Sequence, residues 1–85
     1  MTESDIEIHY MVTKKVNTKV VVSEVINLIY AYVQNKEVYF KYEPHFHEGV
    51  LIFCIVGFQS DHKELQKLLG KDINKFKCEL EILQE

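Results

Sequence analysis

The feature that most constrains the fold is the uninterrupted apolar run from Val50 to Phe58. A strand with one wet face alternates apolar and polar residues, whereas a continuous apolar run is typical of a strand that is covered on both faces. The run is also far shorter than the ~18 apolar residues of a membrane-spanning helix. It therefore predicts a central strand within a soluble domain.

Three further segments alternate with the period of two residues that strands show. In 5–13, Ile6, Ile8, Tyr10 and Val12 share one side, and Glu7, His9 and Met11 share the other. In 37–43, Val38, Phe40 and Tyr42 are expected to face inward and Tyr39 and Lys41 outward. Pro44 is expected to end this strand, because proline cannot donate to the ladder. A last strand is predicted at 77–83, with Cys78, Leu80 and Ile82 on one side.

Two segments have helical spacing instead. One helix is predicted at 19–34, with Thr18 as its N-cap and an apolar stripe of Val22, Val25, Ile26, Ile29 and Val33. The β-branched portion from Lys19 to Val22 could alternatively form a strand. A second helix is predicted at 61–69, capped by Ser60 or Asp61 with Glu64 completing a capping box, and ended by Gly70.

The resulting order is βαββαβ, with the central apolar run as the third strand at 50–58. Right-handed crossovers then require an antiparallel four-stranded sheet in the order 4-1-3-2, with both helices on one face. We therefore expect residues 1–85 to form a single ferredoxin-like α+β domain. This architecture hosts many unrelated functions and indicates none of them.

The charges and the cysteines limit which kinds of partner and which cellular compartment are expected. The net charge is −3, and all ten basic side chains are lysines, so the arginine fork that suits phosphates and guanine is missing. Nucleic acid is therefore not expected as a partner. Cys54 and Cys78 lie within apolar alternation, which favours reduced, buried thiols. With no signal-like segment at Met1 to Asp5 and no membrane span, we expect a cytoplasmic protein without membrane contact.

The third strand also suggests an interaction surface. If Leu51, Phe53 and Ile55 face the helices, the opposite face carries an apolar stripe that a lone monomer would expose. We interpret that stripe as a protein interface formed by Val50, Ile52, Cys54, Val56 and Phe58 together with Met11 and Tyr39. Two alternatives are a tail or loop that covers the stripe, and an error of one residue in the strand facing.

His45 and His47 are the densest group of unusual residues. Their i, i+2 spacing on extended backbone points both imidazoles the same way, so they could supply two ligands of a zinc, nickel or copper site. His9, Glu48 or Cys54 could supply a third ligand. The alternative is a solvated hairpin loop that holds two histidines by chance.

No motif indicates catalysis, since the sequence has neither a glycine-rich phosphate loop nor a CxxC pair. We therefore expect a non-enzymatic interaction or regulatory module without a cofactor, acting as a homodimer or as the small subunit of a complex. The alternatives are a small metal- or ligand-binding protein that uses the His45/His47 loop and, more weakly, a phage-type or plasmid-type inhibitor.

Overall fold

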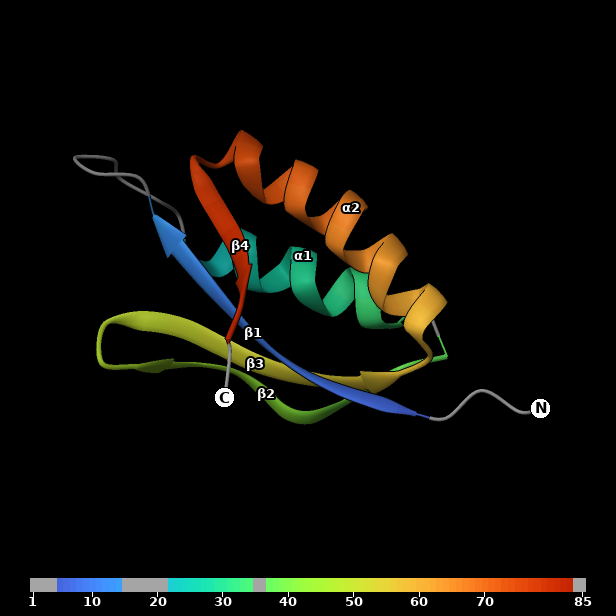
Figure 1. The fold of residues 1–85 in the computed structure, drawn as a ribbon. Coiled ribbons are helices and arrows are strands. Elements are labelled where there is room, and N and C mark those ends of the chain that lie inside the picture. The colour runs from blue at the N-terminus through green and yellow to red at the C-terminus, as the bar shows by residue number, and fades with distance from the viewer. Residues whose placement is uncertain (1–4, 15–21, 35–36, 84–85) are drawn as a thin grey trace.

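The computed structural model describes residues 5–14, 22–34 and 37–83. Their elements run in the order β1 (Ile6–Lys14), α1 (Val22–Gln34), β2 (Tyr39–His47), β3 (Val50–Gly57), α2 (Gln59–Lys75) and β4 (Cys78–Ile82). The strands form one antiparallel sheet in the order β2-β3-β1-β4, which is the predicted order read from the other edge. Both helices lie on the same side of this sheet (Figure 1), so the ferredoxin-like prediction is confirmed.

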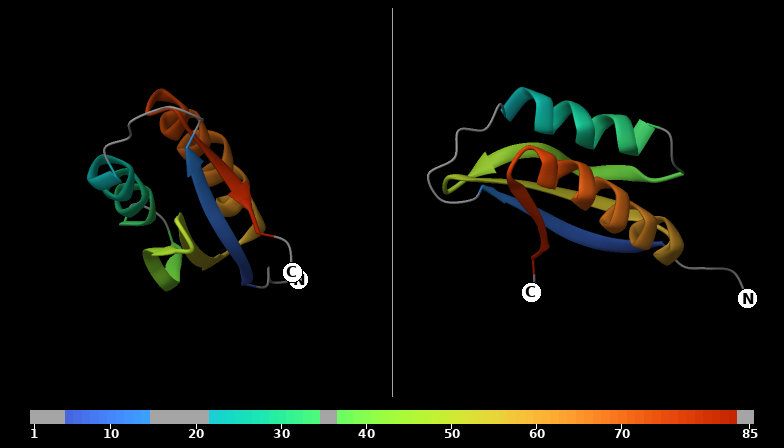
Figure 2. Two further views of the ribbon diagram at one scale, coloured as in Figure 1. Left: turned by 90° about the vertical axis from the view of Figure 1, so that its left-hand side faces the viewer. Right: turned by 90° about the horizontal axis from the view of Figure 1, so that it is seen from above.

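The core lies between the sheet and the two helices (Figure 2). The predicted facing of β1 and β3 is confirmed, because Tyr10 and Val12 of β1 and Leu51, Phe53 and Ile55 of β3 are buried in the core beneath the helices. α1 buries Val25, Ile29 and Val33 of its predicted stripe, whereas Val22 at the start of the helix is 37% exposed. The sheet contributes Tyr10, Val12, Leu51, Phe53 and Ile55, and the helices contribute Val25, Ile29, Val33, Leu65, Leu69 and Ile73. Neither helix of the described part is long and apolar enough to cross a bilayer.

One polar residue, His62 of α2, is buried within this core at 1% exposure. Its Nε2–H donates to the Ile6 carbonyl at 2.7 Å, which leaves Nδ1 to accept the Tyr10 hydroxyl at 2.8 Å. The Gln66 amide donates to the same Tyr10 oxygen at 3.2 Å. Because both ring nitrogens of His62 have a hydrogen-bond partner, a histidine can be buried between α2 and β1.

The end of β2 differs from the prediction, because the strand continues past Pro44 to His47. β2 is an edge strand, so the nitrogen of Pro44, which has no proton to donate, can face away from the neighbouring strand. The pairing with β3 shifts register between Tyr42 and His45, which accommodates Pro44 as an irregularity. The loop is thereby reduced to Glu48 and Gly49, whose φ angles of 52° and 83° match the type I′ turn of two-residue hairpins.

Helix α2 is longer at both ends than the predicted 61–69. It begins at Gln59 with Phe58 as N-cap and without a side-chain cap hydrogen bond, so the predicted capping by Ser60 or Asp61 is wrong. It also continues through Gly70, because Ile73 extends the buried stripe of Leu65 and Leu69 by another turn. The helix ends at Lys75, and Lys77, not a glycine, adopts the left-handed conformation beyond it.

Helix α1 begins at Val22 in the described part of the chain. Val22 is therefore helical, contrary to the alternative of a strand over Lys19 to Val22. The rest of that segment and the predicted N-cap Thr18 lie outside the described residues.

Gly57 closes β3 where β2 begins, and there is no room for a side chain. A methyl group at this position would lie 3.1 Å from the Val38 Cβ and closer still to its Cγ1. Gly57→Ala is therefore expected to lower the free energy of unfolding by about 1–3 kcal/mol, measured by chemical denaturation. Gly70→Ala is the matched control, because nothing lies within 4 Å of its new methyl and it should stabilise the helix. Equal effects of the two substitutions would contradict the packing at Val38.

Candidate functional site

The candidate site lies on the face of the sheet that the helices leave open. Val50, Ile52 and Val56 of β3 are half-buried there, as is Met11 of β1. Tyr39 on the neighbouring edge strand is 57% exposed. Five of the seven predicted interface residues therefore share this face with part of their surface accessible.

The other two predicted interface residues are placed differently. Phe58 lies beyond the end of β3, where it precedes α2, so it is not part of the stripe. Cys54 belongs to the open face but has 0% of its surface exposed. Other side chains on the open face must therefore cover the middle of the predicted stripe.

Cys54 is covered by side chains from the two strands that flank β3. His9 of β1 and Tyr42 of β2 are both directly paired with Cys54. Their side chains are joined by a hydrogen bond of 2.8 Å between His9 Nδ1 and the Tyr42 hydroxyl, and their ring centroids lie 5.6 Å apart. This bridge spans β3 and separates the exposed apolar residues into two groups.

Tyr42 reaches the open face because of a β-bulge. Phe40 pairs with Ile55 and Tyr42 with the neighbouring Cys54, so Lys41 is the extra residue between them. A bulge of one residue reverses the facing of the residues that come after it in the strand. The prediction that Tyr42 faces inward is therefore wrong, and this error hid its contact with His9.

Charged groups complete the cluster around His9. Its Nε2 lies 2.9 Å from Glu7 Oε2, and Lys41 Nζ lies 2.7 Å from Glu7 Oε1. The Lys41 hydrogen bond, followed by that of His9, lowers the pKa of the Glu7 carboxyl, which is therefore ionised near neutral pH. Burial raises the pKa of Tyr42, with Cys54 and Glu7 as further causes, so its hydroxyl keeps its proton.

The structure brings together a different set of potential metal ligands from the predicted one. His45 and His47 pair with Ile52 and Val50, so both lie on the open face, and both are exposed. His45 Nδ1 donates to the Glu43 carbonyl at 2.8 Å. Among the described residues, the potential ligand atoms that gather within 4.8 Å of one another belong to Glu7, His9 and Cys54. His9 and Cys54 were predicted only as third ligands for the hairpin histidines.

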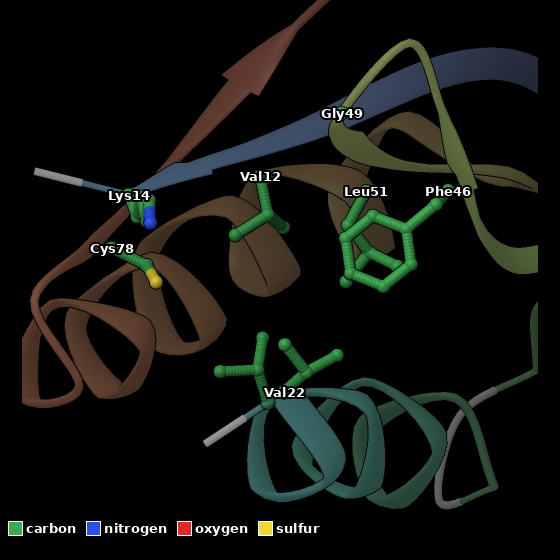
Figure 3. Close-up of a pocket in the computed structure, with 8 residues that line it drawn as sticks. Val12, Lys14, Val22, Phe46, Gly49, Leu51 and Cys78 are labelled. Atoms are coloured by element: carbon green, nitrogen blue, oxygen red, sulfur yellow. The ribbon is translucent and has the colours of Figure 1, made fainter. Parts of the chain in front are cut away.

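A small cavity lies on the opposite side of the sheet, between α1 and the β2–β3 hairpin (Figure 3). Val12 and Leu51 face Val22 across it, and Phe46 forms one side. Its volume is about 80 Å³, well below the ~150 Å³ cavity that admits benzene. It is therefore suited to an alkyl group and not to a whole small molecule, which leaves the open sheet face as the better candidate.

Both thiols are buried and are not joined by a disulfide, as expected. Cys78 lines the small cavity, and burial raises the pKa of its thiol. Its apolar surroundings differ from those of Cys54, which has polar side chains around it on the open face. Comparison with protein-family models, curated proteins and solved structures gives no match to this chain.

Proposed function

We propose that the chain is a non-enzymatic, cytoplasmic interaction module that pairs with a second copy of itself through the open face of the sheet. The observation that carries this proposal is the half-buried apolar group of Ile52, Val50 and Met11 on a face that no helix covers. Tyr39, with 57% of its surface exposed, adds an aromatic side chain of the kind enriched at interfaces. Association would remove these side chains from water.

The charges at the two edges of the sheet favour a symmetric pair. β4 presents Glu79 and Glu81 on the open face, while β2 presents Lys41, His45 and His47 there. A twofold axis that runs along the strands places β2 of one copy over β4 of the other. The dimer would then contain two identical contacts, each between the glutamates of one copy and Lys41 with the two imidazoles of the other, which is the self-complementarity that a twofold interface requires.

The size of the face indicates a modest affinity. Four strands at spacings of about 4.8 Å, on average about 25 Å long, cover roughly 500 Å² in projection. Stable complexes typically bury ~800 Å² on each partner. We therefore expect a dimer whose population depends on concentration.

The test is the native mass of the chain across a range of concentrations, by sedimentation or light scattering. Wild type should approach twice its 10.1 kDa chain mass as the concentration rises. Ile52→Lys should remain monomeric, with a dissociation constant raised at least ~100-fold, because an unpaired ammonium would be buried at the centre of the contact. The lysine stem can still cover the sheet in the monomer, so the fold should persist.

Leu68→Lys is the matched control. Leu68 is a similarly accessible apolar residue at 36% exposure, but it lies on α2, away from the open face. This variant should dimerise like wild type. A wild type that stays monomeric at the highest concentrations would reject self-association, and equal masses for the two variants would reject this face as the contact.

A further inference from the structure

The strongest unassigned feature of the molecule is the group of Glu7, His9 and Cys54 at the centre of the open face. Glu7 and His9 are two residues apart on β1, so their side chains point to the same face. Cys54 lies directly opposite His9 on β3, the other central strand. The two central strands of the sheet thus hold three side chains of different chemistry close together.

We propose that Glu7, His9 and Cys54 form a binding site for a single divalent transition-metal ion, for which zinc is the best match. Thiolate, imidazole and carboxylate are the three ligand types that zinc takes in proteins. An ionised thiol and carboxylate together would also offset the two charges of the ion. This site differs from the predicted His45/His47 site, because it uses neither hairpin histidine.

The distances suit a tetrahedral ion after small side-chain movements. Zinc bonds of about 2.0–2.3 Å place ligand atoms about 3.3–3.6 Å apart at tetrahedral angles. Here His9 Nε2 and Glu7 Oε2 lie 2.9 Å apart, and one potential ligand atom from each of the three residues lies within 4.8 Å of the other two. Side-chain shifts of about one ångström would therefore complete the geometry without moving the backbone.

The surroundings of the ligands support the proposal more specifically than the distances do. Glu7 directs Oε2 toward His9, while its other oxygen, Oε1, is held by Lys41. His9 directs Nε2 toward Glu7, while its other nitrogen, Nδ1, is held by the Tyr42 hydroxyl. Metal-binding histidines and carboxylates have outer partners of this kind, which orient the ligand and select its tautomer.

A metal ion on Nε2 would take the place of the proton that His9 shares with Glu7. The ring proton would then reside on Nδ1, and the Tyr42 oxygen is placed to accept it. The thiol of Cys54 lies beneath this bridge with no exposed surface, whereas the side chains of His9 and Glu7 are 23% and 37% exposed. In the monomer, the ion would therefore have protein ligands below and a fourth position open to water above.

The test is titration of the full chain, without a histidine tag, by zinc in calorimetry and by cobalt(II) in absorption. One equivalent should bind, and cobalt should give the charge-transfer band of a thiolate ligand. Cys54→Ser should abolish that band and weaken binding at least ~100-fold. Tyr42→Phe should keep the band and weaken binding by roughly 10-fold, since only an outer hydrogen bond is lost.

Glu7→Gln serves as a second ligand variant if Cys54→Ser does not fold, because Glu7 is exposed enough for substitution to be tolerated. The paired substitution His45→Gln/His47→Gln is the control and should bind like wild type. The proposal fails if wild type shows no saturable binding, if Glu7→Gln binds as tightly as wild type, or if only the paired histidine variant loses binding. Ile52→Lys should keep the cobalt band, so failure of dimerisation and failure of metal binding are read separately.

Discussion

Replacing His62 with leucine is expected to lower the free energy of unfolding by about 2–4 kcal/mol. Leucine fills a similar space, but it can neither accept the Tyr10 hydroxyl proton nor donate to the Ile6 carbonyl. The Tyr10 O–H would lose its acceptor and the Ile6 carbonyl its His62 donor, while Gln66 still donates to the Tyr10 oxygen, and each unsatisfied buried group costs about 1–3 kcal/mol. Urea denaturation followed by circular dichroism measures the change.

Two further variants separate lost hydrogen bonding from lost packing. His47→Leu removes an exposed histidine from the hairpin and should change stability by less than about 0.5 kcal/mol. The double variant Tyr10→Phe/His62→Leu removes both partners of the buried bond, so it should be more stable than the sum of the single effects predicts. Simple additivity, or equal losses for His62→Leu and His47→Leu, would show that the buried network contributes little.

The parts of the fold that depend on periodicity could be predicted from the sequence. The alternation of β1 and the stripe of α1 each repeat over several residues, and the buried side of each is the apolar side. The order of elements then limits the topology to one arrangement. Prediction failed where a rule for one residue type was applied without its context.

Pro44 and Gly70 are two examples. Pro44 interrupts a strand only where its N–H would be needed, and an edge strand leaves one side of its backbone unpaired. A glycine such as Gly70 ends a helix only if packing holds no residue beyond it. Here Ile73 is fully buried one turn later. At Gly70, packing of Ile73 outweighs the cost of about 1 kcal/mol that a helical glycine carries.

The centre of the open face could be predicted only in part. The i, i+2 spacing of Glu7 and His9 is visible in the sequence, but their proximity to Cys54 depends on the register of β1 with β3. Tyr42 depends in addition on the bulge at Lys41, for which the sequence has no glycine or other marker. A single inserted residue thus moved one aromatic ring to the other face and changed the groups that this face presents.

Alkaline pH is expected to remove the contribution of Tyr10 to stability. Burial raises the pKa of this phenol to about 12 from an ordinary value of 10.0, so the folded state favours the protonated hydroxyl. Below pH 10 both states are protonated and the stabilisation is fully present. Between pH 10 and 12 only the unfolded chain ionises, and wild type should lose about 3 kcal/mol from this group alone.

Tyr10→Phe isolates this effect from the other groups that titrate at high pH. At pH 7 the variant should be less stable than wild type by about 1–2 kcal/mol, because His62 Nδ1 loses its donor. Lysines and the remaining tyrosines titrate in both proteins, so the difference between their unfolding free energies reports Tyr10. That difference should shrink as pH rises above 10 and change sign at about pH 11, where the loss from Tyr10 ionisation equals the advantage of about 1–2 kcal/mol at pH 7. A difference that stays constant from pH 7 to 12 would mean that the Tyr10 hydroxyl ionises as readily in the fold as in the unfolded chain.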